Sequence, residues 1–208
     1  MANTTFKGTL RSEGGYSSIA TAASTGAETT QMSISSAGFA SLDANTLATE
    51  AGTGITGGTG TIYRSSVIRE GGIIKTSILI DLTGLRSTAS GDIIGVNGTS
   101  NVCHIGQITA ARNGTILAGR MTCFEAPAGG DPDINVHSAT EGTGVEDGAI
   151  SDLTETLLVN AGDASVGSVV IFTAVPAADE FLYLTLGATT DADYTAGKLL
   201  IELFGYEA

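Results

Sequence analysis

The sequence predicts an all-β protein, an antiparallel β-sandwich of jelly-roll-like type preceded by an extended N-terminal arm. Composition is the first observation, because 29 of the 208 residues are glycine and Thr, Ser, Ile, Val and Leu are abundant. Such a composition favours strands and tight turns. The second observation is that short apolar segments recur between turn residues from Thr61 onward, while no segment keeps a helical period. A chain of this pattern and length fits two packed sheets.

Residues 1–60 are predicted to form the arm and a hinge. They are rich in Ser, Thr and Gly, and their apolar side chains are widely spaced. Ordering each residue costs about 1–2 kcal/mol of backbone entropy, so we expect the arm to become ordered on another surface. Within it, QMSISSAGFASL alternates as a strand does. The glycine-rich AGTGITGGTGT at 51–61 is predicted to be the hinge.

The body, residues 61–208, is predicted to consist of strands joined by turns. In chain order the predicted strands are TIYRSSVIR, GIIKTSILIDLTGL, DIIGVNG, NVCHIGQITA, TILAGRMTCFEA, INVHSAT, LTETLLVN, GSVVIFTAV, EFLYLTLG and GKLLIELFGYE. Alternation in KTSILIDLT places four side chains on one face and leaves the opposite face partly polar. The four are Thr76, Ile78, Ile80 and Leu82.

Turn signals separate several of these strands. Asn113-Gly114 predicts a type I′ turn that closes a hairpin over GQITAARNGTILAGR. Asn97-Gly98 gives a second, weaker turn signal. Single helical turns are expected near AISDLTETLL and PAADEF.

The final strand carries apolar side chains on both faces. One face is made of Leu199, Ile201 and Leu203. The other is interrupted by Glu202 and otherwise consists of Leu200, Phe204 and Tyr206. Such a strand belongs in the middle of a sheet, or is covered by another subunit or by the arm. We therefore predict that Leu200, Phe204 and Tyr206 form an oligomer or partner contact.

The formal net charge is −13, from 22 acidic and 9 basic residues. A field of this sign repels phosphate backbones and anionic lipids, so binding to nucleic acid or membrane is not expected. The opening MANTTFKGTLRSEGG lacks the apolar core of a signal peptide. No window approaches the roughly 20 apolar residues of a membrane span. We expect the protein to be made in a cytoplasm.

The residues give no signature of catalysis or of a cofactor. Cys103 and Cys123 are too far apart in sequence for a metal pair; two buried free thiols are favoured over a pair on neighbouring strands. His104 and His137 lack ligand spacing and are expected to be structural or on the surface. No nucleophile elbow occurs, and the glycine-rich stretch lacks the Lys of a phosphate-binding loop. We expect no enzyme activity.

Acidic loops offer one weak metal hypothesis. Asp131 and Asp133 lie two apart in GGDPDIN, and oxygen ligands of this kind suit Ca²⁺. The ligand spacing of an EF-hand is missing, so solvated loop carboxylates are the favoured interpretation.

The two ends of the chain carry a resemblance to a known family. The matching residues are Phe6, Gly8, Arg11, Ser12, Gly14, Gly15 and Tyr16 near the start, and Tyr194, Thr195, Ala196, Gly197 and Lys198 near the end. Together they resemble small virion structural proteins of marine, short-tailed, T7-like phages. The resemblance implies a capsid decoration or cement protein that forms a homotrimer on a lattice of major capsid protein at the virion surface.

A clamp of this kind fits an arm that becomes ordered on a scaffold. An extended chain spans about 3.3 Å per residue, so 50 residues could cross between capsomers. The arm residues expected to make the contact are Phe6, Arg11, Tyr16 and Phe39.

Other functions remain open from the sequence. A tail-fibre or receptor-binding module, carbohydrate-binding among the possibilities, also suits a Gly/Ser/Thr-rich start and a β-rich body. Against it, aromatic platforms for sugars are scarce, with five Tyr, six Phe and no Trp. A major capsid protein is disfavoured because no long helix is predicted, although a jelly-roll shell protein escapes that objection. An enzyme ranks last.

Overall fold

The computed structural model describes residues 16–21, 28–34, 40–42 and 49–207. The chain divides into two compact units, Met1–Leu47 and Ala48–Ala208. Each unit is described by itself below.

The first unit contains three paired strands. They are β1 (Tyr16–Thr21), β2 (Glu28–Ile34) and β3 (Ala40–Leu42), and they form an antiparallel sheet in the order β1-β2-β3. The segment predicted as one alternating strand thus contributes to two strands, β2 and β3. Ordering of this part of the chain on another surface stays a prediction.

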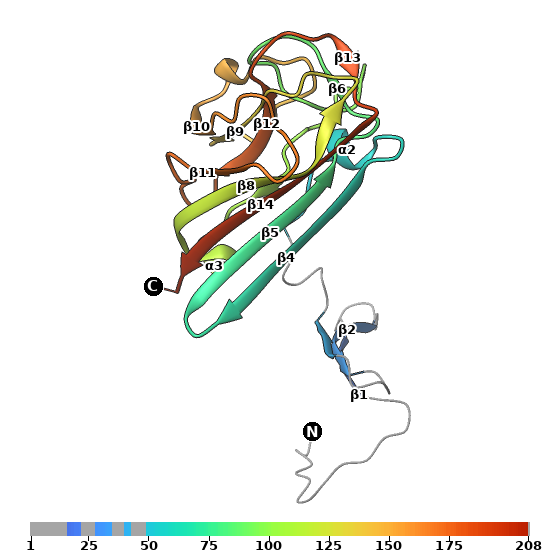
Figure 1. Ribbon diagram of the computed structural model, residues 1–208. Coiled ribbons are helices and arrows are strands. Elements are labelled where there is room, and N and C mark those ends of the chain that lie inside the picture. The colour runs from blue at the N-terminus through green and yellow to red at the C-terminus, as the bar shows by residue number, and fades with distance from the viewer. Residues whose placement is uncertain (1–15, 22–27, 35–39, 43–48, 208) are drawn as a thin grey trace, which may run out of the picture. The chain divides into compact units, whose positions relative to one another are not determined.

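The second unit is the body, an antiparallel β-sandwich, which confirms the predicted fold class. Its five-stranded sheet has the order β11 (Val169–Ile171), β8 (Thr115–Ala128), β14 (Ala196–Tyr206), β5 (Ile73–Asp81) and β4 (Ile62–Glu70). Its four-stranded sheet has the order β10 (Glu155–Val159), β9 (Ile134–Ala139), β12 (Phe181–Leu186) and β7 (Gly106–Gln107). Figure 1 shows β8, β14, β5 and β4 side by side, with β9, β10 and β12 in the second layer. The jelly-roll arrangement stays a prediction.

Short elements complete the body. They are a two-stranded pairing of β6 (Arg86–Ser87) with β13 (Ala192–Asp193), the helices α2 (Thr53–Thr56) and α3 (Ala110–Asn113), and the 3₁₀ turn η1 (Ile150–Asp152). The predicted helical turn near AISDLTETLL coincides with η1.

The core lies between the two sheets and follows the two-residue period of the strands. On β5, Thr76, Ile78 and Ile80 are buried, as the alternation predicts. On β14, the wholly apolar face is fully buried, and the facing four-stranded sheet contributes Val136 and Leu184. The interior is therefore made by alternate residues of strands that are distant in sequence.

The apolar C-terminal segment is explained by its place in the sheet. β14 pairs with β5 from Lys198 to Tyr206 and with β8 on its other side. A central strand has its backbone groups satisfied on both edges, so it can run apolar almost to the chain end. This confirms the predicted central position of the final strand.

The predicted hinge at 51–61 is wrong, because this segment is packed into the body. The Gly52 N–H donates to the His104 carbonyl at 2.8 Å, and the Gly54 N–H donates to the Val102 carbonyl at 2.9 Å. Ile55 is completely buried. A Cβ at Gly54 would collide with the Cys103 side chain, so glycine here allows close backbone approach. The body begins at Ala48 and not at residue 61.

The predicted hairpin at Asn113-Gly114 is also wrong. Its two arms, β7 and β8, lie in different sheets, and α3 connects them. The buried Asn113 side chain accepts from the Thr109 N–H at 2.9 Å and donates to the Thr76 hydroxyl at 2.8 Å. Gly114 has φ +68°, whereas Asn113 ends the helix. Tertiary hydrogen bonds of the Asn side chain therefore outweigh the local preference for a turn.

Both cysteines are free and buried, which confirms the favoured prediction. Burial raises the pKa of the Cys103 thiol to about 12, so little thiolate is present near neutral pH.

We predict that an aromatic disulfide reagent labels neither thiol in the native protein and both after denaturation. Fast labelling of the native protein, or no free thiol after denaturation without reductant, would contradict this.

A substitution at Ile201 tests whether this side chain belongs to the core. Ile201→Ala removes a completely buried side chain from the centre of β14 and should lower the free energy of unfolding by about 2–5 kcal/mol. Val166→Ala, at a side chain that is 69% exposed, should change it by less than about 0.5 kcal/mol. Denaturant titration of both variants measures the difference, and equal effects would place Ile201 outside the core.

Candidate functional site

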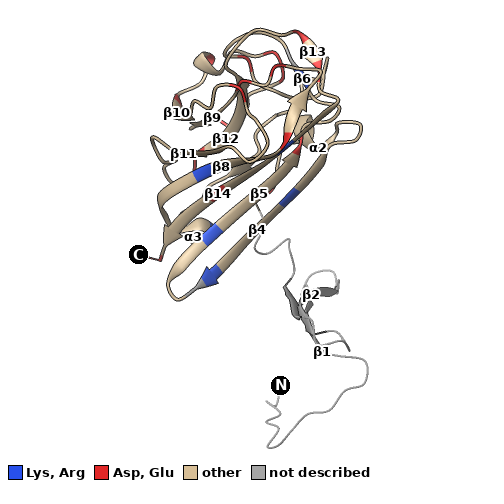
Figure 2. Cartoon of the chain, viewed as in Figure 1, with Lys and Arg blue, Asp and Glu red and all other residues tan. Residues whose placement is uncertain are grey.

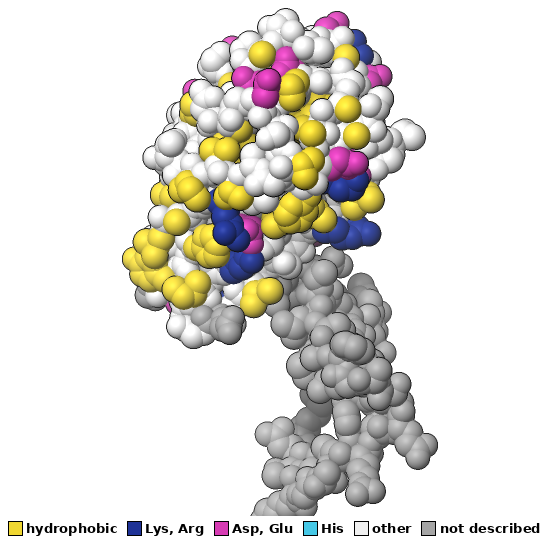
Figure 3. Space-filling view, in the orientation of Figure 1, with side chains coloured by type: hydrophobic (Ala, Val, Ile, Leu, Met, Phe, Trp, Pro, Cys, Tyr) yellow, Lys and Arg dark blue, Asp and Glu magenta, His cyan; other side chains and the backbone are white. Residues whose placement is uncertain are grey.

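The candidate site is the face of the five-stranded sheet that points away from the four-stranded sheet, called here the outer face. Eight of the eleven exposed large hydrophobic side chains among the described residues belong to strands of this sheet. They are Ile62, Ile68, Ile73, Leu117, Phe124, Val169, Ile171 and Tyr206. Figure 3 shows apolar side chains gathered over this sheet, around a cluster of charged ones. Exposed apolar surface of this extent is typical of an interaction site.

Two β-bulges in β8 add to the apolar outer face. Opposite Phe204 and Gly205 of β14, the register skips Leu117, and opposite Lys198 and Leu199 it skips Phe124. The skipped residues are 61% and 53% exposed, respectively. Each bulge thus turns a large apolar side chain toward solvent.

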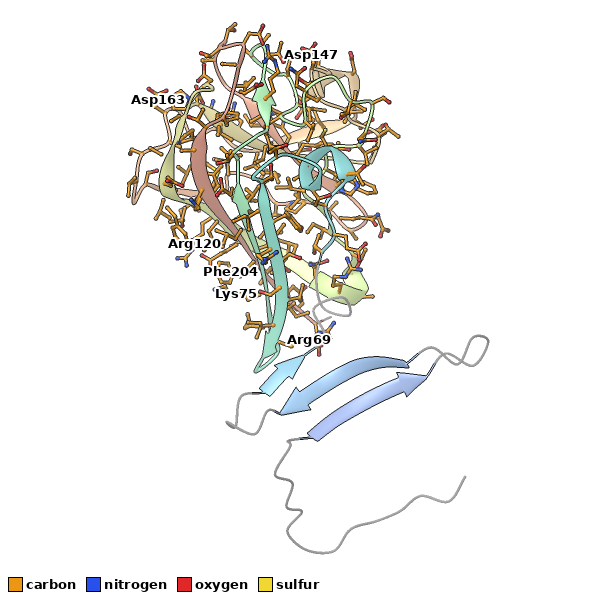
Figure 4. All side chains as sticks on the ribbon, turned by 90° about the vertical axis from the view of Figure 1, so that its right-hand side faces the viewer. Arg69, Lys75, Arg120, Asp147, Asp163 and Phe204 are labelled. Carbon is orange, nitrogen blue, oxygen red and sulfur yellow. The ribbon has the colours of Figure 1, made fainter. Side chains whose placement is uncertain are left out.

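A buried carboxylate lies near the middle of the outer face. Glu202 on β14 is only 3% exposed, because Lys75 from β5 and Arg120 from β8 cover it. The Lys75 Nζ and Arg120 Nε atoms each lie 2.5 Å from a Glu202 oxygen. The Arg120 guanidinium also lies 5.9 Å from the centre of the Phe204 ring, and Figure 4 labels Arg120, Phe204 and Lys75 close together. We call Lys75, Glu202 and Arg120 the basic triad.

The basic triad lowers the pKa of Glu202. Burial by itself raises this pKa, but hydrogen bonds from Arg120 and Lys75, together with their charges, outweigh the effect of burial. Glu202 is therefore held as a carboxylate. Lys75 and Arg120 each form an ion pair with this carboxylate.

A second triad, of opposite net charge, is centred on Lys198, four residues before Glu202 on β14. Lys198 of β14 contacts Glu125 of β8, and its Nζ lies 3.3 Å from an Asp81 oxygen of β5. Asp81 also accepts hydrogen bonds from the Thr83 hydroxyl at 2.7 Å and N–H at 3.1 Å. We call Asp81, Lys198 and Glu125 the acidic triad.

The outer face is nearly neutral, although the chain carries a net charge of −13. Its basic residues Arg64, Lys75, Arg120 and Lys198 account for four of the nine Lys and Arg in the chain. The described acidic side chains on the same face are those of Glu202, Asp81 and Glu125. Figure 2 shows Lys and Arg on β4, β5 and β8, whereas Asp and Glu gather near β6, β13 and β10. A nearly neutral, apolar face on the surface of an acidic molecule suits contact with another protein.

The structure brings together the three C-terminal residues predicted to make a contact. Leu200, Phe204 and Tyr206 all lie on the outer face, at alternate positions of β14. Whether they contact a partner stays a prediction. Of the four predicted arm residues, Tyr16 begins β1, and the others lie outside the described residues; these are Phe6, Arg11 and Phe39.

Much of the outer face could not be identified from the sequence. The bulge residues Leu117 and Phe124 sit in a strand that reads as irregular, and Ile171 belongs to a strand of only three residues. In the sequence alone, an exposed apolar residue of a short strand cannot be distinguished from a core residue, because the face it occupies depends on how the strand pairs. No pattern within β8 itself marks the two bulges, because a bulge is defined by the register with the partner strand.

The weak Ca²⁺ candidates have partners within the protein. The Asp131 carboxylate accepts from the Asp133 N–H at 2.9 Å and from the Thr190 hydroxyl at 2.8 Å. Burial, followed by the charges of Asp131 and Asp163, raises the pKa of Asp133. Within the described ranges, no group of three His, Cys, Asp or Glu side chains is arranged to hold a metal ion. Asp131 thus organises its own loop.

The two histidines lie apart and pack differently. The His104 ring lies 5.0 Å from the Phe181 ring, centroid to centroid, and burial lowers the pKa of His104. His137 on β9 is hydrogen bonded to Glu155 of β10 at 2.7 Å. His104 also lines a small pocket with Glu50, Gln107, Arg112 and Phe181.

The C-terminal motif of the family resemblance has a structural place. Tyr194 is buried and its hydroxyl donates to the Asp131 carbonyl at 2.8 Å. Gly197 has φ +135° and lies against Pro127. The next residue, Lys198, enters the acidic triad, so the motif leads the chain into β14.

Compared with protein-family models, with curated proteins and with solved structures, the chain gives no match. In the part of the chain that the structure describes, no helix has the length and apolar character needed to cross a bilayer.

The basic triad makes a prediction about stability and pH. Glu202→Gln leaves Lys75 and Arg120 without a carboxylate and should lower the free energy of unfolding by about 1–3 kcal/mol near pH 7. Because the pKa of Glu202 is lowered by folding, this contribution is present above the unfolded pKa near 4 and is lost as pH falls through the folded pKa. Denaturant titrations of both proteins between pH 7 and pH 3 should therefore converge at low pH.

Glu207→Gln is the matched control. Glu207 also pairs with an arginine, Arg69, but its side chain is 54% exposed, so the substitution should change stability by less than about 1 kcal/mol. A difference at Glu202 that stays constant with pH would show that the carboxylate charge is not what stabilises the triad.

Proposed function

We propose that the chain is a non-enzymatic virion structural protein that decorates or cements a phage capsid, with the outer face as a contact surface in that assembly. The observation that carries the proposal is the concentration of exposed apolar side chains on one nearly neutral sheet face. The resemblance of the two chain ends supplies the virion context. The N-terminal unit, which carries the first resemblance motif, is proposed as the second contact with the major capsid protein.

The outer face has enough area and apolar content for a stable contact. Five strands about 4.8 Å apart, with an average length of about nine residues at about 3.3 Å per residue, cover on the order of 700 Å². A standard protein interface uses about 800 Å² per partner. Full burial of one large apolar side chain contributes about 1.5–3 kcal/mol, so a few of the eight exposed side chains suffice.

Charge supports docking through this face. The remaining surface of an acidic protein repels further copies of itself and other anionic surfaces. The neutral outer face carries no such penalty. Repetition over a shell would then add many moderate contacts through multivalency.

The proposal is tested on purified virions and on particles that lack the protein. Hundreds of copies per particle, counted by quantitative mass spectrometry, are expected for a decoration protein. Tens of copies or fewer would contradict decoration and favour a tail-fibre or receptor-binding module.

A substitution in the outer face tests the surface itself. Ile171→Arg places a charge on a side chain that is 62% exposed and should weaken rebinding to particles at least tenfold, because a charge would be buried without a partner. Leu157→Arg is the control, since Leu157 is exposed on β10 of the other sheet. Equal rebinding of both variants and the unmodified protein would remove the outer face from the capsid contact.

A further inference from the structure

We propose that the outer face binds the outer face of a second copy of this chain, about a two-fold axis that crosses β14 at Leu200. The inference rests on the proposed function in treating the outer face as a contact surface, and a dimer closed in this way would have to separate before the same face could meet a capsid. It adds the partner and the geometry of the contact, and both follow from the two charged triads.

The β14 members of the two triads lie at equal distances on either side of Leu200. Lys198 precedes Leu200 by two residues on β14, and Glu202 follows it by two. The acidic triad has a net charge of −1 and the basic triad a net charge of +1. At about 3.3 Å per residue, the two centres are about 13 Å apart along the strand.

A two-fold axis lying in the interface and running across the strands exchanges the two ends of each strand. It places β14 of one copy antiparallel over β14 of the other, with β8 over β8 and β5 over β5. Because the acidic row then faces the basic row, Lys198 meets Glu202 of the second copy and Glu125 meets Arg120. Both of these pairs have opposite charge, and Asp81 meets the uncharged Ser77.

The alternative axis, parallel to the strands, is disfavoured by the same charges. It would bring Lys198 over Lys198 and Glu202 over Glu202, and like charges placed together in an interface cost several kcal/mol. Electrostatic complementarity therefore selects one of the two face-to-face arrangements.

The centre of the contact is uncharged. Leu79 of β5 and Thr122 of β8 are the cross-strand neighbours of Leu200, so all three lie along the axis and each faces its own counterpart. All three are half-buried in the single chain. Packed sheets lie about 10 Å apart with strands within about 30° of alignment, which this arrangement allows.

Apolar side chains surround this centre, and Ile171 and Phe124 lie on the β8 side of the sheet. Covering them removes exposed apolar surface from both copies at once, because a two-fold contact buries the same patch twice. The outer faces are also the part of the molecule where two acidic chains repel each other least.

Charge exchange in the full-length chain tests the geometry. Arg120→Glu gives the basic triad a net charge of −1, and Glu125→Lys gives the acidic triad a net charge of +1. Each variant alone should raise the dimer dissociation constant at least tenfold, as measured by sedimentation equilibrium. An equimolar mixture should dimerise as well as the unmodified protein, because each changed triad then faces its complement.

A second pair of variants avoids the triads, in case Arg120→Glu destabilises Glu202. Thr122 lies on the axis, so Thr122→Arg and Thr122→Glu each place like charges against each other in a homodimer. The two mixed together should form a heterodimer. Leu157→Arg, on the other sheet, should leave the dimer unchanged. Thermal unfolding of every variant checks that it is folded.

The outcomes separate this inference from the proposed function. A monomer at about 100 μM, a trimer, or mixtures that do not restore dimers would overturn the two-fold contact, even if the protein still binds capsid particles through the same face. Restored dimers with no binding to particles would keep the contact and reject the capsid role.

Discussion

The pairing of β14 with β8 and β5 is the constraint on which the rest of the body depends. This pairing fixes which residues of β14 enter the core and which reach the outer face, since a shift by one residue would exchange the two sets. Ile201 is then buried, and Glu202 is placed between Lys75 and Arg120. The same register aligns the two triads on three neighbouring strands. Core, charge pattern and candidate contact are therefore consequences of one strand alignment.

The outer face combines exposed apolar side chains with a buried carboxylate, whose burial is offset by ion pairs with its neighbours. A carboxylate such as Glu202 is costly to remove from water unless it is paired and hydrogen bonded. Lys75 and Arg120 provide those bonds, and the Arg120 guanidinium also lies near the Phe204 ring. The face thus stays neutral and mostly apolar while it keeps an ordered arrangement of charges, which gives a contact direction as well as affinity.

Fold class, the central position of the last strand and the buried face of β5 could be predicted, because a two-residue period is a local property of the chain. The hairpin at Asn113-Gly114 failed because Asn113 is bound by Thr76, 37 residues away in sequence. The prediction of a hinge at 51–61 was wrong because a glycine-rich segment is equally consistent with a flexible linker and with close backbone packing. The bulges that expose Leu117 and Phe124 depend on the partner strand, so no reading of β8 alone could place them.

The five-stranded sheet ends on β4, a nine-residue strand with one edge not paired to another strand of the sheet. Such an edge invites strand addition by further chains, and exposed charged side chains discourage it. Arg64 is exposed on this strand, and Arg69 is tied to Glu207 near the end of β14. Growth of the sheet into a fibre is thereby opposed at its longest free border. Association is left to the outer face, where the proposed two-fold pair would stop further addition.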